Sequence, residues 1–89
     1  MLKAFIVTGR VQGVGFRWFT RQTASELGLR GTVRNARNGS VEVVADGTRE
    51  ALDELERRLR RGPGAAVVEG VEEVPPPAGA VPDDFRVLR

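Results

Sequence analysis

The order of strand-like and helix-like segments is the feature that most limits how this chain of 89 residues folds. Apolar residues recur every three to four positions in two segments, and runs of residues that favour strands lie around them. The predicted helices are Phe16–Leu27 and a second helix that Thr48 caps, with Ala51, Leu52, Leu55 and Leu59 on one face. The predicted strands are Leu2–Thr8, Leu29–Asn35, Ser40–Ala45, a segment within Ala65–Val74, and Phe85–Arg89.

The connections between these segments indicate the topology. The Asn38–Gly39 pair between two strand-like runs predicts a hairpin, Gly62–Gly64 ends the second helix, and the prolines within Pro75–Pro82 predict a loop. The order strand–helix–strand–strand–helix–strand, with right-handed crossovers, interleaves two β-α-β units. We therefore expect residues 1–89 to form one α+β domain. This domain is a ferredoxin-like βαββαβ sandwich, an antiparallel sheet with both helices on one face.

The composition excludes several kinds of chemistry, because the chain has no Cys, no His and no Tyr. Without Cys there is no disulfide framework, thiolate metal site or Cys nucleophile. Without His there is no Ser-His-Asp triad and no imidazole base. The adjacent acids Glu72–Glu73 and Asp83–Asp84 lack the spacing of a metal-binding loop, so we expect no metal and no cofactor.

Arginine dominates the basic residues, at 13 of 14, but the net charge is only +2. This small excess is a weak indication of a nucleic-acid partner. Four arginines cluster at the end of the second helix, and three of them have an acidic residue one turn earlier. The predicted pairs are Asp53–Arg57, Glu54–Arg58 and Glu56–Arg60. Ion pairs on the helix surface therefore explain the cluster better than contact with nucleic acid.

No apolar run is long enough to cross a membrane, and no secretory signal is present. We therefore expect a cytoplasmic protein that does not bind a membrane. No segment indicates an obligate interface, so we expect a monomer.

The stretch Gly9–Arg17 joins the first strand to the first helix and reads Gly-Arg-Val-Gln-Gly-Val-Gly-Phe-Arg. Glycines allow a tight turn and close approach of an anion to backbone N–H groups, and the helix start adds unsatisfied donors. The helix dipole disfavours Arg17 in the first turn, and this local conflict hints at function, because a guanidinium can bind two phosphate oxygens. The spacing alone also fits a plain glycine-rich turn with an exposed arginine.

Two motifs in the chain resemble the signatures of the acylphosphatase family. Gly9–Arg17 resembles the first signature, and Gly31–Asn35 with the later Gly39, Val41 and Gly47 keeps the spacing of the second. The ferredoxin-like order is also the fold of this family. Thr32 departs from the pattern, because the family usually has an aromatic residue there. Strand alternation puts Thr32 on the face opposite Asn35, so we expect altered surface packing or stability and unchanged roles elsewhere.

The resemblance implies a metal-independent acylphosphatase, which hydrolyses the carboxyl–phosphate bond of small acyl phosphates to a carboxylate and inorganic phosphate. It implies that the loop binds phosphate through Gln12, Gly13, Val14, Gly15, Phe16 and Arg17. Arg17 and Asn35 are then catalytic, because Arg17 holds the phosphate and Asn35 positions the attacking water. Inorganic phosphate is expected to compete with substrate. The lack of a general base favours an anhydride over a monoester, because a carboxylate leaves without help from an acid.

Two alternatives to an independent enzyme share this fold, which also occurs in RNA-binding and small-ligand domains. RNA binders of this shape stack bases on aromatic residues of the central strands, but Ser40–Ala45 has none and the first strand has only Phe5. Acylphosphatase-like domains also occur within larger carbamoyl-transfer proteins of hydrogenase maturation, and the length of 89 residues and the start at Met1 favour a separate enzyme. Trp18 lies off the apolar stripe of its helix and is expected to be a partly exposed packing residue rather than a wall near the site.

Overall fold

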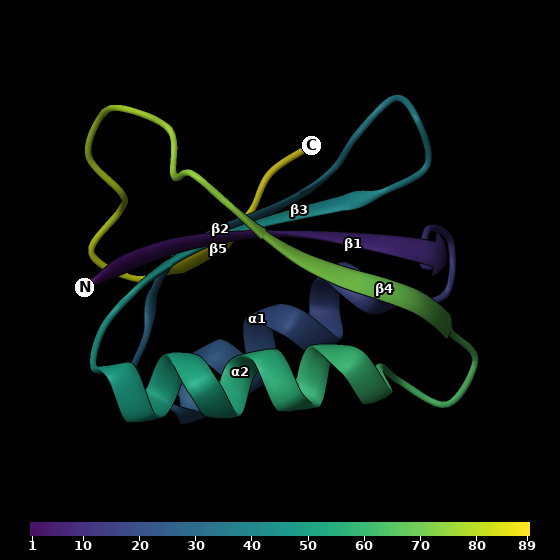
Figure 1. Cartoon of the computed structure of the whole chain (residues 1–89), viewed down its shortest axis with the longest axis horizontal. Coiled ribbons are helices and arrows are strands. Elements are labelled where there is room, and N and C mark those ends of the chain that lie inside the picture. Colours follow the sequence, from purple (N-terminus) through teal and green to yellow (C-terminus); the bar gives the residue numbers. More distant parts are fainter.

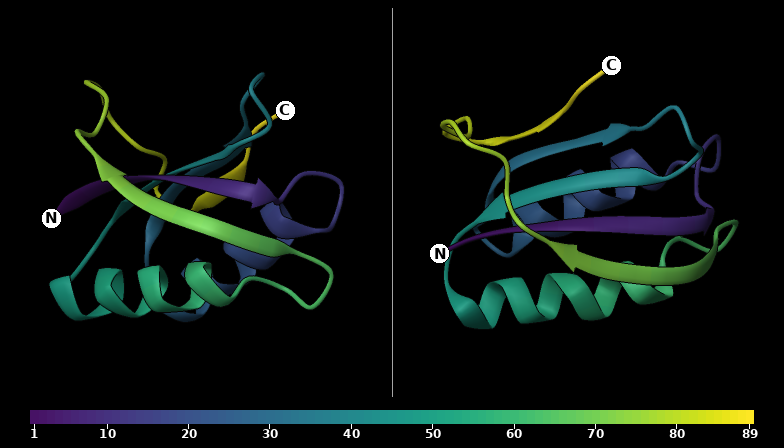
Figure 2. Two further views of the ribbon diagram at one scale, coloured as in Figure 1. Left: turned by 45° about the vertical axis from the view of Figure 1, so that its right-hand side comes forward. Right: turned by 45° about the horizontal axis from the view of Figure 1, so that its top comes forward.

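The computed structural model describes residues 1–89, and its elements follow the predicted order (Figure 1). They are β1 (Leu2–Arg10), α1 (Phe16–Glu26), β2 (Arg30–Asn35), β3 (Val41–Asp46), α2 (Arg49–Arg61), β4 (Val67–Val74) and β5 (Phe85–Val87). The five strands form one sheet in the order β4-β1-β3-β2-β5, and both helices cover one face of it (Figure 2). The predicted ferredoxin-like α+β sandwich is confirmed.

The direction of the fifth strand departs from the expectation of an antiparallel sheet. The pairs β4–β1, β1–β3 and β3–β2 are antiparallel. The pair β2–β5 is parallel, with Phe85 opposite Gly31. The reason lies in the proline-rich loop, because it carries the chain across the end of the sheet where β4 ends and β2 begins. β5 therefore enters beside β2 and runs the same way, which brings the residues after Val87 toward the end of the sheet that holds Asn35.

One apolar core between the sheet and the helices fixes these elements. α2 contributes the fully buried Leu52, Leu55 and Leu59, which recur at helical spacing as predicted. α1 contributes Phe16, and the buried hydroxyl of Thr20 donates a hydrogen bond of 2.9 Å to the Phe16 carbonyl oxygen. Each large apolar side chain buried in this way stabilises the fold by about 1.5–3 kcal/mol. The core therefore holds the start of α1, and with it Arg17, in a fixed place against the sheet.

Some boundaries differ from the prediction by one or two residues. β1 continues past Thr8 to Arg10, because a β-bulge between Thr8 and Gly9 restores its pairing with β4. β5 is shorter than predicted and ends at Val87. The prediction for the start of α2 is confirmed, since the Thr48 hydroxyl accepts a hydrogen bond of 3.1 Å from the Ala51 N–H.

Ion pairs cover the outer face of α2. The pairs that form are Glu54–Arg58 at 2.9 Å, Glu56–Arg60 at 2.8 Å and Glu54–Arg57 at 2.8 Å. The predicted pair Asp53–Arg57 is wrong, because Arg57 reaches Glu54 three residues earlier while Asp53 lies 4.0 Å from Lys3. Hydrogen bonds from Arg58 and Arg57 lower the pKa of Glu54. Neither helix has the length and apolar character to cross a membrane.

Candidate active site

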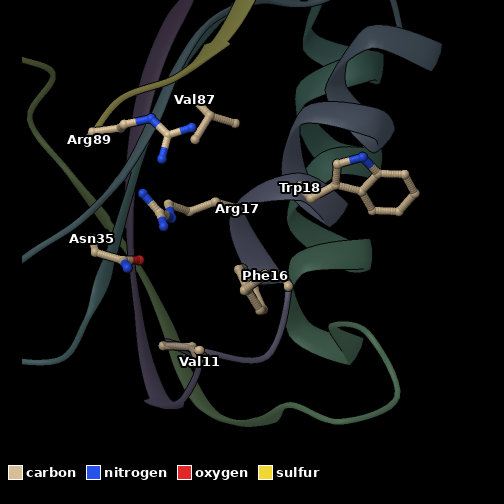
Figure 3. A pocket seen from close by; sticks show the side chains of 9 residues that line it. Val11, Phe16, Arg17, Trp18, Asn35, Val87 and Arg89 are labelled. Carbon is tan, nitrogen blue, oxygen red and sulfur yellow. The ribbon is translucent and has the colours of Figure 1, made fainter.

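A pocket of about 320 Å³ lies where the β1–α1 loop, the end of β2 and the segment after β5 meet (Figure 3). Its lining comprises Val11, Gly13, Gly15, Phe16, Arg17 and Trp18 from the loop and the start of α1, Asn35 from β2, and Val87 and Arg89 from the C-terminal segment. Two guanidinium groups border the pocket, and no acidic side chain lines it. These properties suit an anionic ligand.

The backbone of the β1–α1 loop forms one wall of the pocket. Gly13 and Gly15 have φ angles of 75° and 77°, in the left-handed region that glycine adopts without steric cost. Gly15 stands immediately before α1, where no side chain caps the helix and no acidic residue occupies the first turn. The first N–H groups of an uncapped helix lack internal partners and carry partial positive charge. The loop and the helix start therefore provide hydrogen-bond donors for an anion.

Arg17 adds a full positive charge to these donors. Its side chain is half-buried, and Nη1 donates a hydrogen bond of 3.1 Å to the Leu88 carbonyl oxygen. This bond orients the guanidinium across the pocket toward Asn35 (Figure 3). A cation in the first turn is disfavoured by the helix dipole, and an anion bound beside it would offset this unfavourable interaction.

Asn35 is the last residue of β2 and faces Arg17 across the pocket (Figure 3). Its amide oxygen Oδ1 is buried and accepts no hydrogen bond from the protein. A buried acceptor without a partner costs free energy, so native proteins keep few of them. An amide oxygen that points into a pocket can accept a hydrogen bond from water.

Gln12 connects the two sides of the site, although its side chain does not line the pocket. Its Nε2 donates hydrogen bonds to the carbonyl oxygens of Ala36, at 2.7 Å, and Ser40, at 2.9 Å. Both acceptors belong to the β2–β3 hairpin turn directly after Asn35. Asn38 supports the same turn, as predicted, because its Oδ1 accepts a hydrogen bond of 3.0 Å from the Ser40 N–H. The side chain of Gln12 therefore holds the glycine-rich loop against the hairpin that carries Asn35.

The pocket brings together most of the residues that the sequence predicts for the site. Gly13, Gly15, Phe16, Arg17 and Asn35 line it, and Gln12 and Val14 lie beside it within the loop. Sequence reasoning missed Val11, Val87 and Arg89. The sequence offers two signals for these residues: Val11 is close to the glycines of the loop, and Val87 fits the alternation of the last strand. It offers no signal for Arg89.

Trp18 borders the pocket, which agrees with the less favoured of its two expected roles. Its side chain is 63% exposed, and its indole ring points away from Arg17 (Figure 3). The first turn of α1 directs Trp18 away from the core that holds Phe16, because residues two positions apart face different sides of a helix.

The ionisable groups with shifted pKa values lie away from the pocket. Hydrogen bonds from Arg30 and from the N-terminal amine lower the pKa of Asp46, and a hydrogen bond from Arg86 lowers the pKa of Asp84. The structure brings together no group of three or more acidic residues that could hold a metal ion. The polar groups of Arg17, Asn35 and Arg89 at the pocket are guanidinium and amide groups.

Thr32 lies on the other face of the sheet, which the helices leave open. There it borders a second cavity of about 450 Å³, together with Arg34 and Glu42. Val33, the next residue, is fully buried on the helix side of the sheet. The expected separation of Thr32 from the site is confirmed, because Thr32 borders this cavity and Asn35 borders the first pocket.

The fold and the first pocket define a small α+β domain with a pocket whose lining suits an anion. The sequence model of the acylphosphatase family matches residues 3–87. An acylphosphatase from Nitratidesulfovibrio vulgaris (strain DP4) is 51% identical over 87 residues, which cover 96% of this chain and 87% of that protein. The chain therefore belongs to the acylphosphatase family. It is an enzyme of the class that hydrolyses acyl phosphates, EC 3.6.1.7.

Solved structures agree with this assignment. The crystal structure of acylphosphatase from Bacillus subtilis has a TM-score of 0.85 and 35% identity, and the match covers 100% of both chains. The crystal structure of T. kodakarensis HypF has a TM-score of 0.84 and 32% identity, and the match covers 100% of this chain and 12% of that one. The fold thus occurs both as a whole chain and as a small part of a larger one.

Proposed function

We propose that the first pocket is the active site and that it hydrolyses the carboxyl–phosphate bond of small acyl phosphates. The loop Gln12–Arg17 and the Arg17 guanidinium hold the phosphoryl group, and Asn35 positions the attacking water. One observation carries this proposal: the buried, unpartnered amide oxygen of Asn35 shares a pocket with Arg17 and the uncapped start of α1.

The chemistry of an acyl phosphate matches what these groups can do. Phosphoryl transfer needs positioning and charge stabilisation more than covalent help. Backbone N–H groups and Arg17 stabilise the charge on the phosphoryl oxygens. Asn35 accepts a hydrogen bond from water and so directs a lone pair of the water oxygen at phosphorus. The proton of the water passes to a phosphoryl oxygen of the substrate, so no protein base is required.

The pocket also supports the expectations about partners. Guanidinium and amide side chains and the absence of a lining carboxylate favour hydrolysis without a metal ion. All the groups of the proposed site come from one chain, which supports a monomer that acts on a small molecule. We also propose that residues 1–89 form a single domain and that the protein is cytoplasmic. Three arginines at the end of α2 are paired with glutamates, which argues against a nucleic-acid partner. Inorganic phosphate competes with substrate for the same donors.

The direct test is hydrolysis of benzoyl phosphate in the presence of EDTA, measured as the release of inorganic phosphate. We expect full activity with the chelator and competitive inhibition by inorganic phosphate. Loss of activity with EDTA contradicts the metal-independent mechanism, and purely non-competitive inhibition contradicts the shared site.

Two variants test the assigned roles. Arg17→Ala should lower kcat/KM by about 10²–10³-fold, the usual effect of removing a donor that stabilises developing charge. Arg21→Ala is the matched control, because Arg21 is exposed one turn further along α1 and does not line the pocket. Asn35→Ala should lower kcat while the inhibition constant of phosphate stays nearly constant. Full activity in both site variants contradicts the assignment.

A further inference from the structure

A second guanidinium, that of Arg89, borders the pocket on the side away from Asn35. The parallel direction of β5 returns the chain to this end of the sheet, and the Leu88 N–H donates a hydrogen bond of 2.8 Å to the Val33 carbonyl oxygen. In Figure 3 the Arg17 guanidinium lies between Asn35 and the guanidinium of Arg89. The three polar side chains of the pocket thus follow one another in the order Asn35, Arg17, Arg89.

This order matches the geometry of a displacement at phosphorus. The attacking and leaving oxygens lie roughly in line on opposite sides of the phosphorus atom. If water is held at Asn35 and the phosphoryl group at Arg17, as proposed above, the leaving group faces Arg89. We infer that Arg89 binds the carboxylate that leaves the acyl phosphate and stabilises the negative charge that develops on it. This inference rests on the proposed roles of Arg17 and Asn35.

The step balances without a further reactant. The water oxygen forms a bond to phosphorus, and the bond between phosphorus and the acyl oxygen breaks. Its electron pair stays on the carboxylate, and the water proton moves to a phosphoryl oxygen. An acyl phosphate dianion and water thus give one carboxylate and one dihydrogen phosphate ion, so the leaving group gains a full negative charge during the step.

Arg89 is suited to this charge. The planar guanidinium can donate two parallel hydrogen bonds to the two oxygens of a carboxylate. No acidic side chain lines the pocket to compete for these donors. Val87 borders the same part of the pocket and offers an apolar contact to the acyl group. The phosphoryl group has its own donors in the loop and Arg17, so Arg89 is free to contact the other product.

Product inhibition tests the inference directly. Benzoate and inorganic phosphate are measured separately as inhibitors of the wild type, Arg89→Gln, Arg89→Lys and the control Arg61→Gln. Arg61 is exposed at the end of α2 and lies outside the pocket. Arg89→Gln should raise the inhibition constant of benzoate about three- to fivefold, as for a partly exposed ion pair, and Arg89→Lys should raise it less. The constant for phosphate should change by less than about twofold, and Arg61→Gln should leave both unchanged.

Turnover provides a second readout. Acetyl phosphate releases a more basic carboxylate than fluoroacetyl phosphate, so it depends more on a cation at the leaving oxygen. Arg89→Gln should therefore lower kcat for acetyl phosphate more than for fluoroacetyl phosphate. Equal losses for both substrates, or an unchanged benzoate constant, overturn the role of Arg89. Failure of the proposed function gives a different result. In that case Arg17→Ala and Asn35→Ala keep full activity, independently of the effect of Arg89→Gln on kcat or on the benzoate constant.

Discussion

Replacing Gln12 with alanine tests whether the active site depends on the contact between its two halves. The Gln12 amide donates to two backbone carbonyl oxygens of the β2–β3 hairpin turn, those of Ala36 at 2.7 Å and Ser40 at 2.9 Å. Gln12→Ala removes both hydrogen bonds, and each carbonyl oxygen keeps one backbone donor, the Gly39 N–H for Ala36 and the Ala36 N–H for Ser40. Gln22→Ala is the matched control, because Gln22 is exposed on α1 and forms no such contact.

The two lost hydrogen bonds set the magnitude. Each typically contributes 0.5–1.5 kcal/mol, so Gln12→Ala should lower the free energy of unfolding by about 1–3 kcal/mol. For a domain of this size each kcal/mol corresponds to about 4–8 °C in melting temperature. The hairpin turn should also move more freely relative to the loop. Because Asn35 directly precedes this turn, kcat should fall about tenfold or more, the order of effect that a small displacement of a positioning group produces.

A double-mutant cycle separates positioning from direct contact. Thermal unfolding gives the stability change, and benzoyl phosphate hydrolysis gives kcat for Gln12→Ala, Asn35→Ala and the double variant. If Gln12 acts by placing Asn35, its substitution should have little further effect on kcat once Asn35 is alanine. The inhibition constant of inorganic phosphate should rise much less than kcat falls.

Two results would refute this reasoning about Gln12. Additive losses of kcat in the double variant mean that Gln12 affects the reaction without acting through Asn35. A large rise in the phosphate inhibition constant at unchanged kcat means that the Gln12 side chain binds phosphate itself.

Three further predictions follow from the same structure. Thr32→Tyr should fill part of the cavity on the open face and stabilise the fold by about 0.5–1 kcal/mol, seen as a higher melting temperature at unchanged kcat. The kcat for benzoyl phosphate should stay constant between about pH 5 and 8, because no His, Cys, Asp or Glu side chain lines the pocket, and a bell-shaped profile contradicts this. Because the pKa of Asp46 is lowered in the folded state, the contacts of this carboxylate stabilise the fold at every pH above its ordinary pKa of 3.8. This contribution is lost as the pH falls through the lowered pKa. The melting temperature should therefore fall in acid, and less steeply for Asp46→Asn.

The fold was predictable because its signals are local. The spacing of Leu52, Leu55 and Leu59 defines the buried face of α2 before any tertiary contact is known. The Asn38–Gly39 pair places the hairpin, and the order of the elements then leaves few ways to arrange the sheet. Errors of one or two residues arise where tertiary contacts decide, as at the bulge that extends β1 to Arg10.

The site was predictable from two kinds of signal. Gly13, Gly15 and Arg17 are close in sequence, in one loop and the helix start after it, so their chemistry could be read from the chain. Asn35 was predicted from the resemblance of Gly31–Asn35 to a family signature. The side-chain role of Gln12 could not be predicted, because its acceptors are backbone carbonyl oxygens 24 and 28 residues away. The place of Arg89 was hidden for another reason, since apolar alternation is the same whether a strand runs parallel or antiparallel.

The fifth strand shows why that direction matters for the enzyme. The ferredoxin-like sandwich needs only the four antiparallel strands, and β5 adds three residues at the edge of the sheet. Phe85 anchors it in the core, where this side chain is 3% exposed. From that anchor the parallel course brings the Leu88 carbonyl oxygen to Arg17 and the Arg89 side chain to the pocket. An antiparallel strand at the same edge would carry both residues to the opposite end of the sheet. The direction of β5 therefore places both groups at the proposed active site.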